Sequence, residues 1–444
     1  MKEDTICAIA SGVGGAVSVI RVSGPEARSV CDGLWRSRSG KSLAHLPPRT
    51  LTLGEFGEPN AIIDPSCLAV FMQSPNSFTG EDVVELHCHG GSLCSRAVLS
   101  SLLKAGARMA EAGEFSKRAF LNGKMDLVQA EAVADMVSAG SEAALKIAGN
   151  QLRGRLGERI RAVQNQLQEL LAEDESRLDF PEEQLDWKPL KAFSDELQTA
   201  QEELRRLAET RDQGELLREG VSLVIAGPPN AGKSTLLNLL LGRDRAIVSD
   251  IPGTTRDTIE ATVQIKGIPF HLTDTAGIRG DASDAIESAG MERTRQAAES
   301  ARLVVWLKDG TRPLAEQAWP DWKIQGKLLE VVNKCDAAPC NDGSAIRISA
   351  LTGQGIDALY SAMTDAVHSA TLESSEIAVA ARHADLLQKA VDEIECALPN
   401  LEVEEWELLA FHLREAVQNL RLITGEVVQY DVLDTIFSKF CIGK

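Results

Sequence analysis

The sequence predicts a chain of several domains: an α+β domain at the N-terminus, an all-α helical domain, and an α/β domain inserted into the helical one. Three observations support this. Short β-rich runs dominate the first 120 or so residues, apolar residues at helical spacing follow, and strand-like runs alternate with helical ones from residue 221. Helical periodicity returns after about residue 372, so the α/β part interrupts one helical domain.

The first segment, 1–120, mixes strands with one helix. Apolar and β-branched runs predict strands at 16–22, 67–72 and 83–87, separated by Pro and Gly turns, and a helix at 92–105. This is an α+β pattern.

The helical domain is predicted from 121–215 and 373–444. Apolar residues recur at steps of three and four from Leu152, with a break near Pro181 and Pro189, until about Arg211. The apolar positions of the two parts are Leu152, Leu156, Ile160, Val163, Leu167, Leu170 and Leu171, then Leu386, Ala390, Ile394, Leu409, Leu413, Val417 and Leu420.

Residues 216–372 read as the α/β domain. A buried-strand run at 221–226 leads through a glycine-rich turn into a helix at 234–241. Further strands at 270–273, 303–307, 329–332 and 346–348 alternate with helical stretches, which predicts a parallel sheet.

Composition excludes several classes. With 444 residues, 44% hydrophobic and 25% charged, the chain is neither disordered throughout nor collagen-like. A net charge of −19 argues against coating nucleic acid by bulk charge. A local basic stretch remains open, with a solvated helix face favoured over an RNA contact: Lys146, Arg153, Arg155, Arg159 and Arg161.

Nine cysteines without a C-x-x-C pair indicate neither a disulfide framework nor a zinc ribbon. His87, Cys88, His89 and Cys94 are close in sequence, but strand alternation sends His87 and His89 to one face and Cys88 to the other, so we do not favour a metal site there. No apolar run approaches the length of a membrane helix, which is about 20 residues. We expect a soluble, cytoplasmic protein.

The run from Gly227 to Ser234 fits G-x-x-x-x-G-K-[ST], directly after a predicted strand and at the start of a predicted helix. In this motif backbone N–H groups converge on phosphate oxygens, the Lys (Lys233) reaches the β and γ phosphates, and the Ser (Ser234) ligates magnesium. The sequence therefore predicts a P-loop.

Three further motifs follow in the order of a P-loop GTPase. Asp274-Thr275-Ala276-Gly277 ends a strand, where it can hold magnesium and meet the γ-phosphate. In Asn333-Lys334-Cys335-Asp336, the Asp336 carboxylate can accept both N–H groups of a guanine edge, which adenine cannot offer. Ser349-Ala350-Leu351 fits the last base-contacting turn. These motifs predict GTP rather than ATP.

The residue after the Asp-Thr-Ala-Gly run is Ile278, where Ras-like GTPases have the Gln that orients water. Water must be aligned by another group, and Asn230, the run Thr254-Thr255-Arg256-Asp257 and the acidic segment 281–287 are the candidates. The alternative is a slow hydrolase that serves as a switch.

Motifs spread over nearly the whole chain extend the comparison. They are Asp4-Thr5-Ile6, Ile20-Arg21-Val22-Ser23-Gly24, Ser77 to Glu85, Gly113-Glu114-Phe115-Ser116, Arg118 to Lys124, Gln129-Ala130-Glu131-Ala132 and the terminal Phe440-Cys441-Ile442-Gly443-Lys444. With these motifs the chain resembles the tRNA modification GTPases called MnmE or TrmE. Departures include Ala112, where the family usually has Pro, and Pro228 in the P-loop.

The resemblance implies roles in GTP hydrolysis. It implies a potassium site formed by Asn230, Ser249, Ile251 and Thr254, magnesium ligands at Ser234 and Thr255, and Glu287 as the residue that orients water, with Asn230 also catalytic. The implied nucleotide-binding residues are Asn230, Ala231, Gly232, Lys233, Ser234, Thr235, Ser249, Asp250, Ile251, Pro252, Gly253, Thr254, Thr255, Asp274, Thr275, Ala276, Gly277, Asn333, Lys334, Asp336, Ser349, Ala350 and Leu351.

For the N-terminal domain the resemblance implies binding of 5-formyl- or methylene-tetrahydrofolate and constitutive dimerisation. The matching folate positions are Arg21, Glu85, Lys124 and Lys444. Arg and Lys suit the anionic glutamate tail, and a carboxylate suits the pterin edge. Cys441 in the terminal motif is a candidate reactive thiol.

As a whole the resemblance implies an enzyme that works with a flavin-dependent partner similar to MnmG (GidA), in a heterotetramer or larger assembly. Together they would add a carboxymethylaminomethyl-type group to carbon 5 of the wobble uridine of certain tRNAs. The FAD belongs to the partner, because no strand here leads into G-x-G-x-x-G. The alternatives are a Ras-like regulatory or ribosome-assembly switch, and a folate-dependent transferase with an incidental GTPase insert.

Overall fold

The computed structural model describes residues 4–12, 14–180, 187–243, 259–273, 294–337, 346–367, 378–428 and 430–444. The chain divides into two compact units, each assembled from separated segments. Unit 1 comprises Met1–Val137, Gly149–Leu204 and Lys389–Lys444, and unit 2 comprises Ser138–Ala148 and Arg205–Gln388. Unit 2 therefore interrupts unit 1, as the predicted insertion requires.

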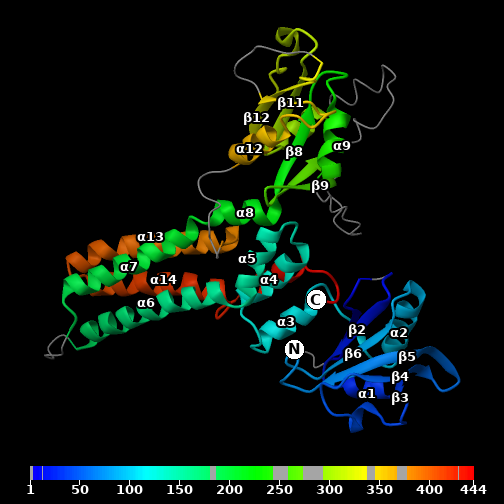
Figure 1. The fold of residues 1–444 in the computed structure, drawn as a ribbon. Helices are drawn as coiled ribbons and strands as arrows, with labels where there is room; N and C mark the ends of the chain where they lie inside the picture. Colours follow the sequence, from blue (N-terminus) through cyan, green and yellow to red (C-terminus); the bar gives the residue numbers. More distant parts are fainter. Residues whose placement is uncertain are drawn as a thin grey trace. The chain divides into compact units, whose positions relative to one another are not determined.

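Unit 1 begins with a sheet that has seven strands among the described residues, in the order β3-β4-β5-β6-β2-β1-β7 (Figure 1). Neighbouring strands are antiparallel except for β1 and β7. Helix α1 (Ala27–Asp32), the short helix η1 (Leu43–His45) and α2 (Ser92–Lys104) join them. The strands are β1 (Ile6–Ile9), β2 (Val17–Ser23), β3 (Trp35–Ser37), β4 (Thr52–Glu58), β5 (Ala61–Met72), β6 (Val83–His89) and β7 (Arg108–Met109).

Alternation along the central strands separates a core face from a polar face. In β6, Val84, Leu86 and Cys88 are buried in the core that also contains Trp35 and Phe56. The intervening positions of β6 carry polar side chains, and Glu85 pairs in register with Arg21 of β2. The strand pattern therefore displays charged groups on one side of the sheet.

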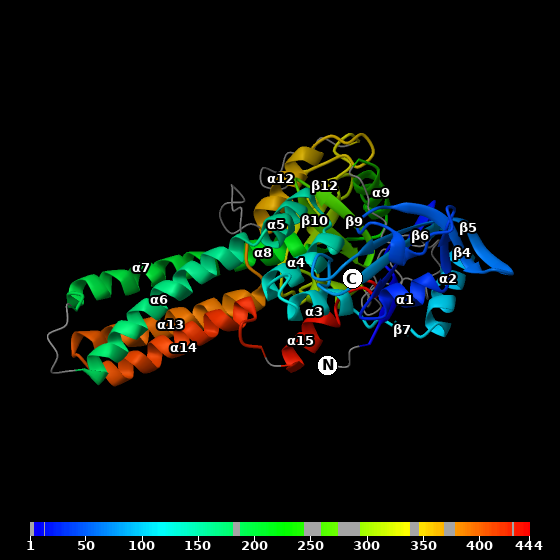
Figure 2. The ribbon, with the colours of Figure 1, turned by 90° about the horizontal axis from the view of Figure 1, so that it is seen from below.

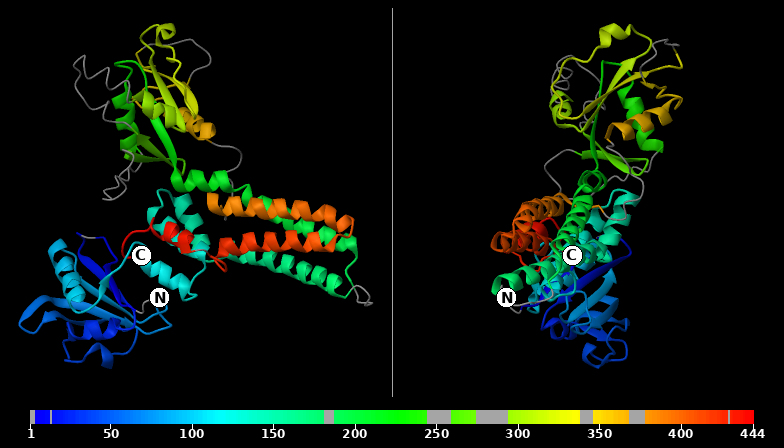
Figure 3. Two further views of the ribbon diagram at one scale, coloured as in Figure 1. Left: turned by 180° about the vertical axis from the view of Figure 1, so that it is seen from behind. Right: turned by 90° about the vertical axis from the view of Figure 1, so that its left-hand side faces the viewer.

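Four long helices, most of whose residues belong to unit 1, lie alongside one another (Figures 2 and 3). They are α6 (Arg155–Asp179), α7 (Leu190–Ala208), α13 (Ala381–Glu402) and α14 (Trp406–Thr424). The predicted break near Pro181 and Pro189 is confirmed, because α6 ends before the first proline and α7 begins after the second.

A second break in the helices, between α5 and α6, was not predicted from the spacing of apolar residues. Leu152 ends the separate helix α5 (Glu142–Leu152), and Gly154, at φ 85°, precedes α6. Glycine tolerates this left-handed backbone, which the spacing of apolar residues does not reveal. Three helices not predicted individually complete unit 1: α3 (Glu114–Leu121), α4 (Leu127–Ser138) and α15 (Tyr430–Phe437).

Unit 2 contains a sheet with the strand order β13-β12-β11-β8-β10-β9 over its described residues. Helices α8 (Arg211–Glu219), α9 (Lys233–Arg243), η2 (Leu314–Gln317) and α12 (Ile356–Val367) accompany it. The strands are β8 (Val221–Ala226), β9 (Ile259–Ile265), β10 (Ile268–Thr273), β11 (Leu303–Asp309), β12 (Lys327–Asn333) and β13 (Ile346–Arg347).

The prediction of a parallel sheet is wrong at one edge. Strand β9 was not predicted, and it pairs antiparallel with β10 through the two-residue turn Lys266-Gly267. Both turn residues have positive φ, 49° and 83°, as a tight hairpin of the primed type requires. The other pairs, β8 with β10 and β11, β11 with β12 and β12 with β13, are parallel.

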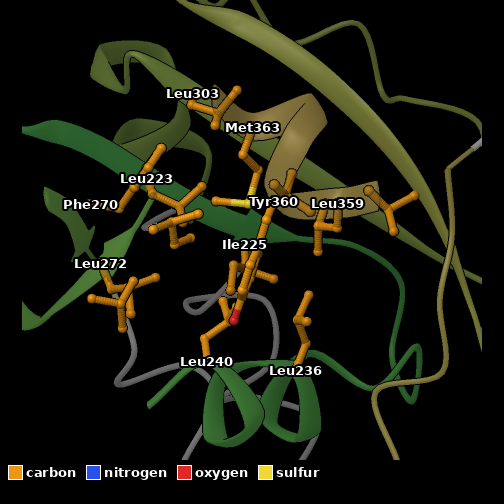
Figure 4. Close-up of a cluster of buried hydrophobic side chains, with 14 of the residues drawn as sticks. Leu223, Ile225, Leu236, Leu240, Phe270, Leu272, Leu303, Leu359, Tyr360 and Met363 are labelled. Atoms are coloured by element: carbon orange, nitrogen blue, oxygen red, sulfur yellow. The ribbon is translucent and has the colours of Figure 1, made fainter. Parts of the chain in front are cut away.

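Helices α9 and α12 pack on the same face of this sheet (Figure 4). Figure 4 shows Leu223 and Ile225 of β8 between Leu240 of α9 and Met363 of α12. The opposite face of β8 packs into a second cluster that includes Trp306. Burial on both faces explains why the parallel strands are continuously apolar in sequence. Within the described ranges, no helix has the length and apolar character needed to cross a bilayer.

One acidic residue is buried in the helix bundle. Asp174 of α6 has an exposed fraction of 0%, and neither carboxylate oxygen has a hydrogen-bond partner among the described residues. Burial raises the pKa of the Asp174 carboxyl to about 7, which Arg177 opposes and Glu175 reinforces. Near neutral pH the group therefore holds its proton much more strongly than an exposed aspartate does.

Replacing Asp174 with Asn should change how stability depends on pH. The native pKa of about 7 exceeds the ordinary value of 3.8, so the free energy of unfolding of the wild type falls as pH rises from about 4 to about 7. At pH 8 the Asp174→Asn variant should be more stable by roughly 3–4 kcal/mol, at about 1.4 kcal/mol for each unit of the pKa difference, and near pH 4 the difference should vanish. Urea unfolding followed by circular dichroism measures this. The exposed Asp195→Asn is the matched control, and a pH-independent difference would contradict the account.

Candidate functional site

The glycine-rich turn after β8 is shaped by two close approaches. Gly227 has φ 154°, and a Cβ there would lie 2.2 Å from the Leu307 carbonyl oxygen. Gly232 has φ 96°, and a Cβ there would lie 2.2 Å from Asn333 Nδ2. Any larger residue would displace the turn, so both glycines of the P-loop motif are required by packing as well as by backbone conformation.

The turn leads into α9, which begins at Lys233 as the motif predicts. The Lys233 ammonium donates hydrogen bonds to the carbonyls of Gly227 and Pro228, each at 2.9 Å, and so lies over the turn. Asn230 is exposed and has φ 63°. Ser234 and Thr235 are exposed in the first turn of α9. This is the N-terminal end of a helix, where backbone N–H groups can receive phosphate.

Asn333 joins two loops that are far apart in sequence. It is buried at the end of β12, and its Nδ2 donates to the Ala231 carbonyl of the P-loop at 2.8 Å. Its Oδ1 accepts the Ala350 N–H at 2.9 Å. Both halves of one amide are therefore used to connect the P-loop to the turn after β13.

Asp309 is a site residue that the sequence analysis missed. It ends β11, and its Oδ2 lies 2.7 Å from the Lys334 ammonium, while Thr311 donates to its Oδ1 through N–H and Oγ. Burial alone would raise the pKa of Asp309, but the bonds from Lys334 and Thr311 outweigh it and lower the pKa to about 2. The signal available in sequence was an Asp-Gly pair directly after a buried strand.

The remaining predicted base-contacting residues lie beside this pair. Asp336 is exposed two residues beyond Lys334. Ser349 is buried, and its Oγ accepts the Thr352 N–H at 3.1 Å, which closes the turn that carries Ala350 and the exposed Leu351. The structure therefore brings together the described members of the GTP set. The predicted residues 249–255, 274–277 and Glu287 lie outside the described residues.

In unit 1 the structure brings Arg21 and Glu85 together on the polar face of the sheet. The guanidinium approaches the carboxylate at 2.8 Å, and both side chains are largely buried. The Arg21 guanidinium also lies 5.0 Å from the ring centroid of Phe78 and 5.6 Å from that of Phe115. Phe115 is fully buried and supports Arg21 from the core, so the partly buried Phe78 is the ring that a flat, polar ligand beside the pair could contact.

The end of the chain returns to this region. The Phe115 N–H donates to the Lys444 carbonyl oxygen at 3.2 Å, and the Gly113 N–H donates to that of Cys441 at 3.4 Å. The exposed thiol of Cys441 thus lies in the segment beside α3. Lys124 instead donates to the Pro75 carbonyl at 3.0 Å, on the 75–80 loop.

Residues from several of the motifs quoted above meet in an ion network around Arg118. Its guanidinium bonds Asp4, Glu81 and Glu114 at distances from 2.7 to 3.2 Å, and only 9% of the side chain is exposed. Arg108 adds bonds to Asp4 and Glu114. These side chains fasten the start of the chain to α3 and to the loop that holds Phe78.

Unit 2 has the features that define P-loop GTPases. Its P-loop and its Asn-Lys-x-Asp turn follow β8 and β12 of one sheet, at the carboxyl ends of parallel strands. The model of the TrmE GTP-binding protein N-terminus matches residues 5–124, and the model of the MnmE helical domain matches residues 127–441. The chain belongs to the MnmE family of tRNA modification GTPases.

Full-length relatives support the same family assignment. The chain is 41% identical to the tRNA modification GTPase MnmE of Clostridioides difficile, over 100% of this chain and 99% of that protein. It is 42% identical to MnmE of Akkermansia muciniphila, with the same coverage. A solved GTP-binding protein from Sulfolobus solfataricus in complex with GDP is 16% identical, covers 58% of this chain and 79% of its own, and has a TM-score of 0.24, too low to add to the assignment.

Replacing Asp309 with Asn should weaken nucleotide binding. Without the carboxylate, Lys334 loses its partner and the base-reading turn becomes less ordered, so we expect GDP and GTP affinity to fall by roughly five- to thirtyfold, or about 1–2 kcal/mol. Titration of a fluorescent guanine nucleotide measures this, with the exposed Asp321→Asn as the control.

The wild type and the Asp309→Asn variant should also differ in how their free energy of unfolding depends on pH. The native pKa of Asp309, about 2, lies below its ordinary 3.8, so its stabilising contribution is complete above about pH 4 and is lost as pH falls toward 2. The difference in unfolding free energy between wild type and Asp309→Asn should shrink over that interval. A difference that grows on acidification, or unchanged nucleotide affinity at neutral pH, would contradict the role given to Asp309.

Proposed function

We propose that this chain is a potassium-stimulated GTP hydrolase that, with a flavin-dependent partner protein, adds a carboxymethylaminomethyl-type group to carbon 5 of the wobble uridine of certain tRNAs. The carbon comes from a folate donor. The observation that carries the GTPase part is the bonding of Asn333 to both the P-loop and the turn after β13, because it supports one composite site for phosphates and base.

Guanine selection follows from the base-reading turn. The exposed Asp336 carboxylate is available to accept the two N–H groups of guanine, and Lys334 is held in place by Asp309. Adenine lacks those donors and would leave the carboxylate unpaired. Ala231, Gly232, Lys233 and Thr235 would meet the phosphates.

Residues of the P-loop fit the expected metal ions. The Ser234 hydroxyl at the start of α9 suits magnesium, with Thr255 as its second protein ligand, and the exposed Asn230 amide oxygen suits potassium. Bound potassium would supply positive charge where other GTPases use an arginine finger. Ser249, Ile251 and Thr254 would complete that site, and Glu287 would orient the attacking water in the absence of a Gln at 278.

The cluster on the polar face of the N-terminal sheet supports the folate proposal. Glu85 suits the donor edge of a pterin, the adjacent Arg21 an acceptor of the same ring, and the partly buried ring of Phe78 its flat face. Lys124 and Lys444 would add positive charge, and Cys441 is proposed as a reactive thiol. A switch that only regulates or assembles ribosomes has no use for such a cluster, which favours the modification enzyme.

We assign four segments to the work of the enzyme: 1–120 for tetrahydrofolate binding and dimerisation, 121–215 and 373–444 for the helical domain, and 216–372 for GTP hydrolysis. The chain acts as a homodimer, joined in the cytoplasm by an MnmG-like partner that carries the FAD. Because the net charge is −19 and Arg161 and Arg159 already pair with Asp126 and Glu203, tRNA is recruited chiefly through that partner.

GTP turnover should respond to the monovalent cation. At constant ionic strength, replacing sodium with potassium should raise the turnover rate by about tenfold or more, since charge supplied at the transition state is worth at least that much. Asn230→Ala should abolish the rise while GTP is still bound. Phosphate release and nucleotide titration measure the two quantities.

The matched control is Asn238→Ala, an exposed asparagine of α9 away from the loop. It should retain the response to potassium. Equal turnover in both salts for the wild type, or an unchanged potassium response in Asn230→Ala, would refute the cation mechanism.

A further inference from the structure

Three potential metal ligands from three elements meet on the core side of the N-terminal sheet. They are Asp64 of β5, Cys88 of β6 and Cys94 of α2, and one ligand atom of each lies within 4.8 Å of the other two. Cys94 Sγ is 3.8 Å from Asp64 Oδ2. In a tetrahedral zinc site, with Zn–S of about 2.3 Å and Zn–O of about 2.0 Å, sulfur and oxygen lie about 3.5 Å apart.

The carboxylate of this cluster is a buried anion. Its side chain has an exposed fraction of 0%, and its partners in the described part of the chain are the backbone N–H groups of Ser66 and His89, the ring of His89 and the Cys94 thiol. The backbone N–H groups of Ser66 and His89 donate to its two oxygens at 2.9 and 2.8 Å. A cation bound here would neutralise it.

Cys88 is buried and Cys94 is partly buried, so both thiols are withdrawn from bulk solvent. The Cys94 thiol directs its hydrogen toward Asp64 Oδ2. Coordination deprotonates a thiol outright, so a divalent ion would release two protons to the solvent and occupy the space between these sulfurs and the carboxylate.

We propose that Asp64, Cys88 and Cys94 form a binding site for a thiophilic divalent cation of the zinc class, with water in the fourth position. His89 acts as a positioning residue: its Nδ1 lies 2.9 and 3.0 Å from the two Asp64 oxygens and orients the carboxylate. Partial exposure of Cys94 gives the ion a path from solvent. The site fastens β5, β6 and α2 together.

This site differs from the pattern considered in the sequence. Alternation does place Cys88 in the core, opposite the face that carries Glu85 and Arg21. His89, however, ends β6, and its ring reaches the carboxylate that also contacts Cys94. Asp64 lies more than twenty residues earlier on a neighbouring strand, so its place in the cluster depends on the fold of the sheet.

The test uses the full-length, reduced protein with excess magnesium and GDP to occupy the P-loop. Zinc is titrated against a chromophoric chelator, and cobalt is added separately to look for a thiolate-to-cobalt charge-transfer band. We expect one equivalent of zinc and the cobalt band in the wild type. Cys94→Ser should lose the band and bind zinc at least tenfold more weakly, since removal of a metal ligand costs at least as much as removal of its outer-shell partner.

The exposed Cys396→Ser is the control and should match the wild type. Absence of the cobalt band from the wild type would overturn the proposal without reference to any variant. Zinc affinity that is equal in wild type, Cys94→Ser and Asp64→Asn would overturn it as well. Thermal unfolding of each variant, with and without zinc, shows whether it is folded, and the wild type alone should gain stability with zinc.

Discussion

The amide of Asn333 is the contact on which the nucleotide site depends. The segments that follow β8, β12 and β13 leave the unit 2 sheet at the same edge. The buried Asn333 side chain bonds the P-loop after β8 to the turn after β13. A buried amide must satisfy both its donor and its acceptor, so the two loops are fixed together. Gly232 leaves the space that the amide occupies, and the Asp309–Lys334 pair orders the next residue of the same turn. Phosphate binding and base reading thus depend on one another.

In unit 1, too, a single side chain holds several segments together. Arg118 gathers three carboxylates from Asp4, Glu81 and Glu114, and this network fixes the 75–80 loop and α3 beside β2. Phe78 and Phe115 are thereby held against Arg21, and the backbone of α3 receives the last residue of the chain. Several of the motifs by which the chain resembles its family, among them those with Asp4, Glu114 and Arg118, therefore hold the Arg21–Glu85 cluster in place. Their side chains are not themselves part of that cluster.

Local sequence patterns were sufficient to predict an element where neighbouring residues alone determine its structure. The run Val221–Ala226 was predicted as a strand with the observed bounds, because a short apolar run before a glycine-rich turn has few other uses. The hairpin strand β9 was missed, since Lys266-Gly267 is a weak turn signal, and the break at Gly154 was hidden within helical spacing. The Asp-Gly pair at Asp309 marked a strand end, but nothing in the spacing indicated that Lys334 would bond its carboxylate. Asp64 could not be found from spacing, because its partners Cys94 and His89 come from elements that only the tertiary fold brings near.

We propose that this chain serves tRNA modification through a folate site and a GTP site. Mass spectrometry of nucleosides from bulk tRNA tests it most directly, in cells that lack the gene and carry either the wild type or Arg21→Ala, whose partner Glu85 belongs to the proposed folate cluster. We predict that wobble uridines with the aminomethyl-type group disappear on deletion, return with the wild type and do not return with Arg21→Ala. Unchanged levels of the modified uridine after deletion would contradict the claim.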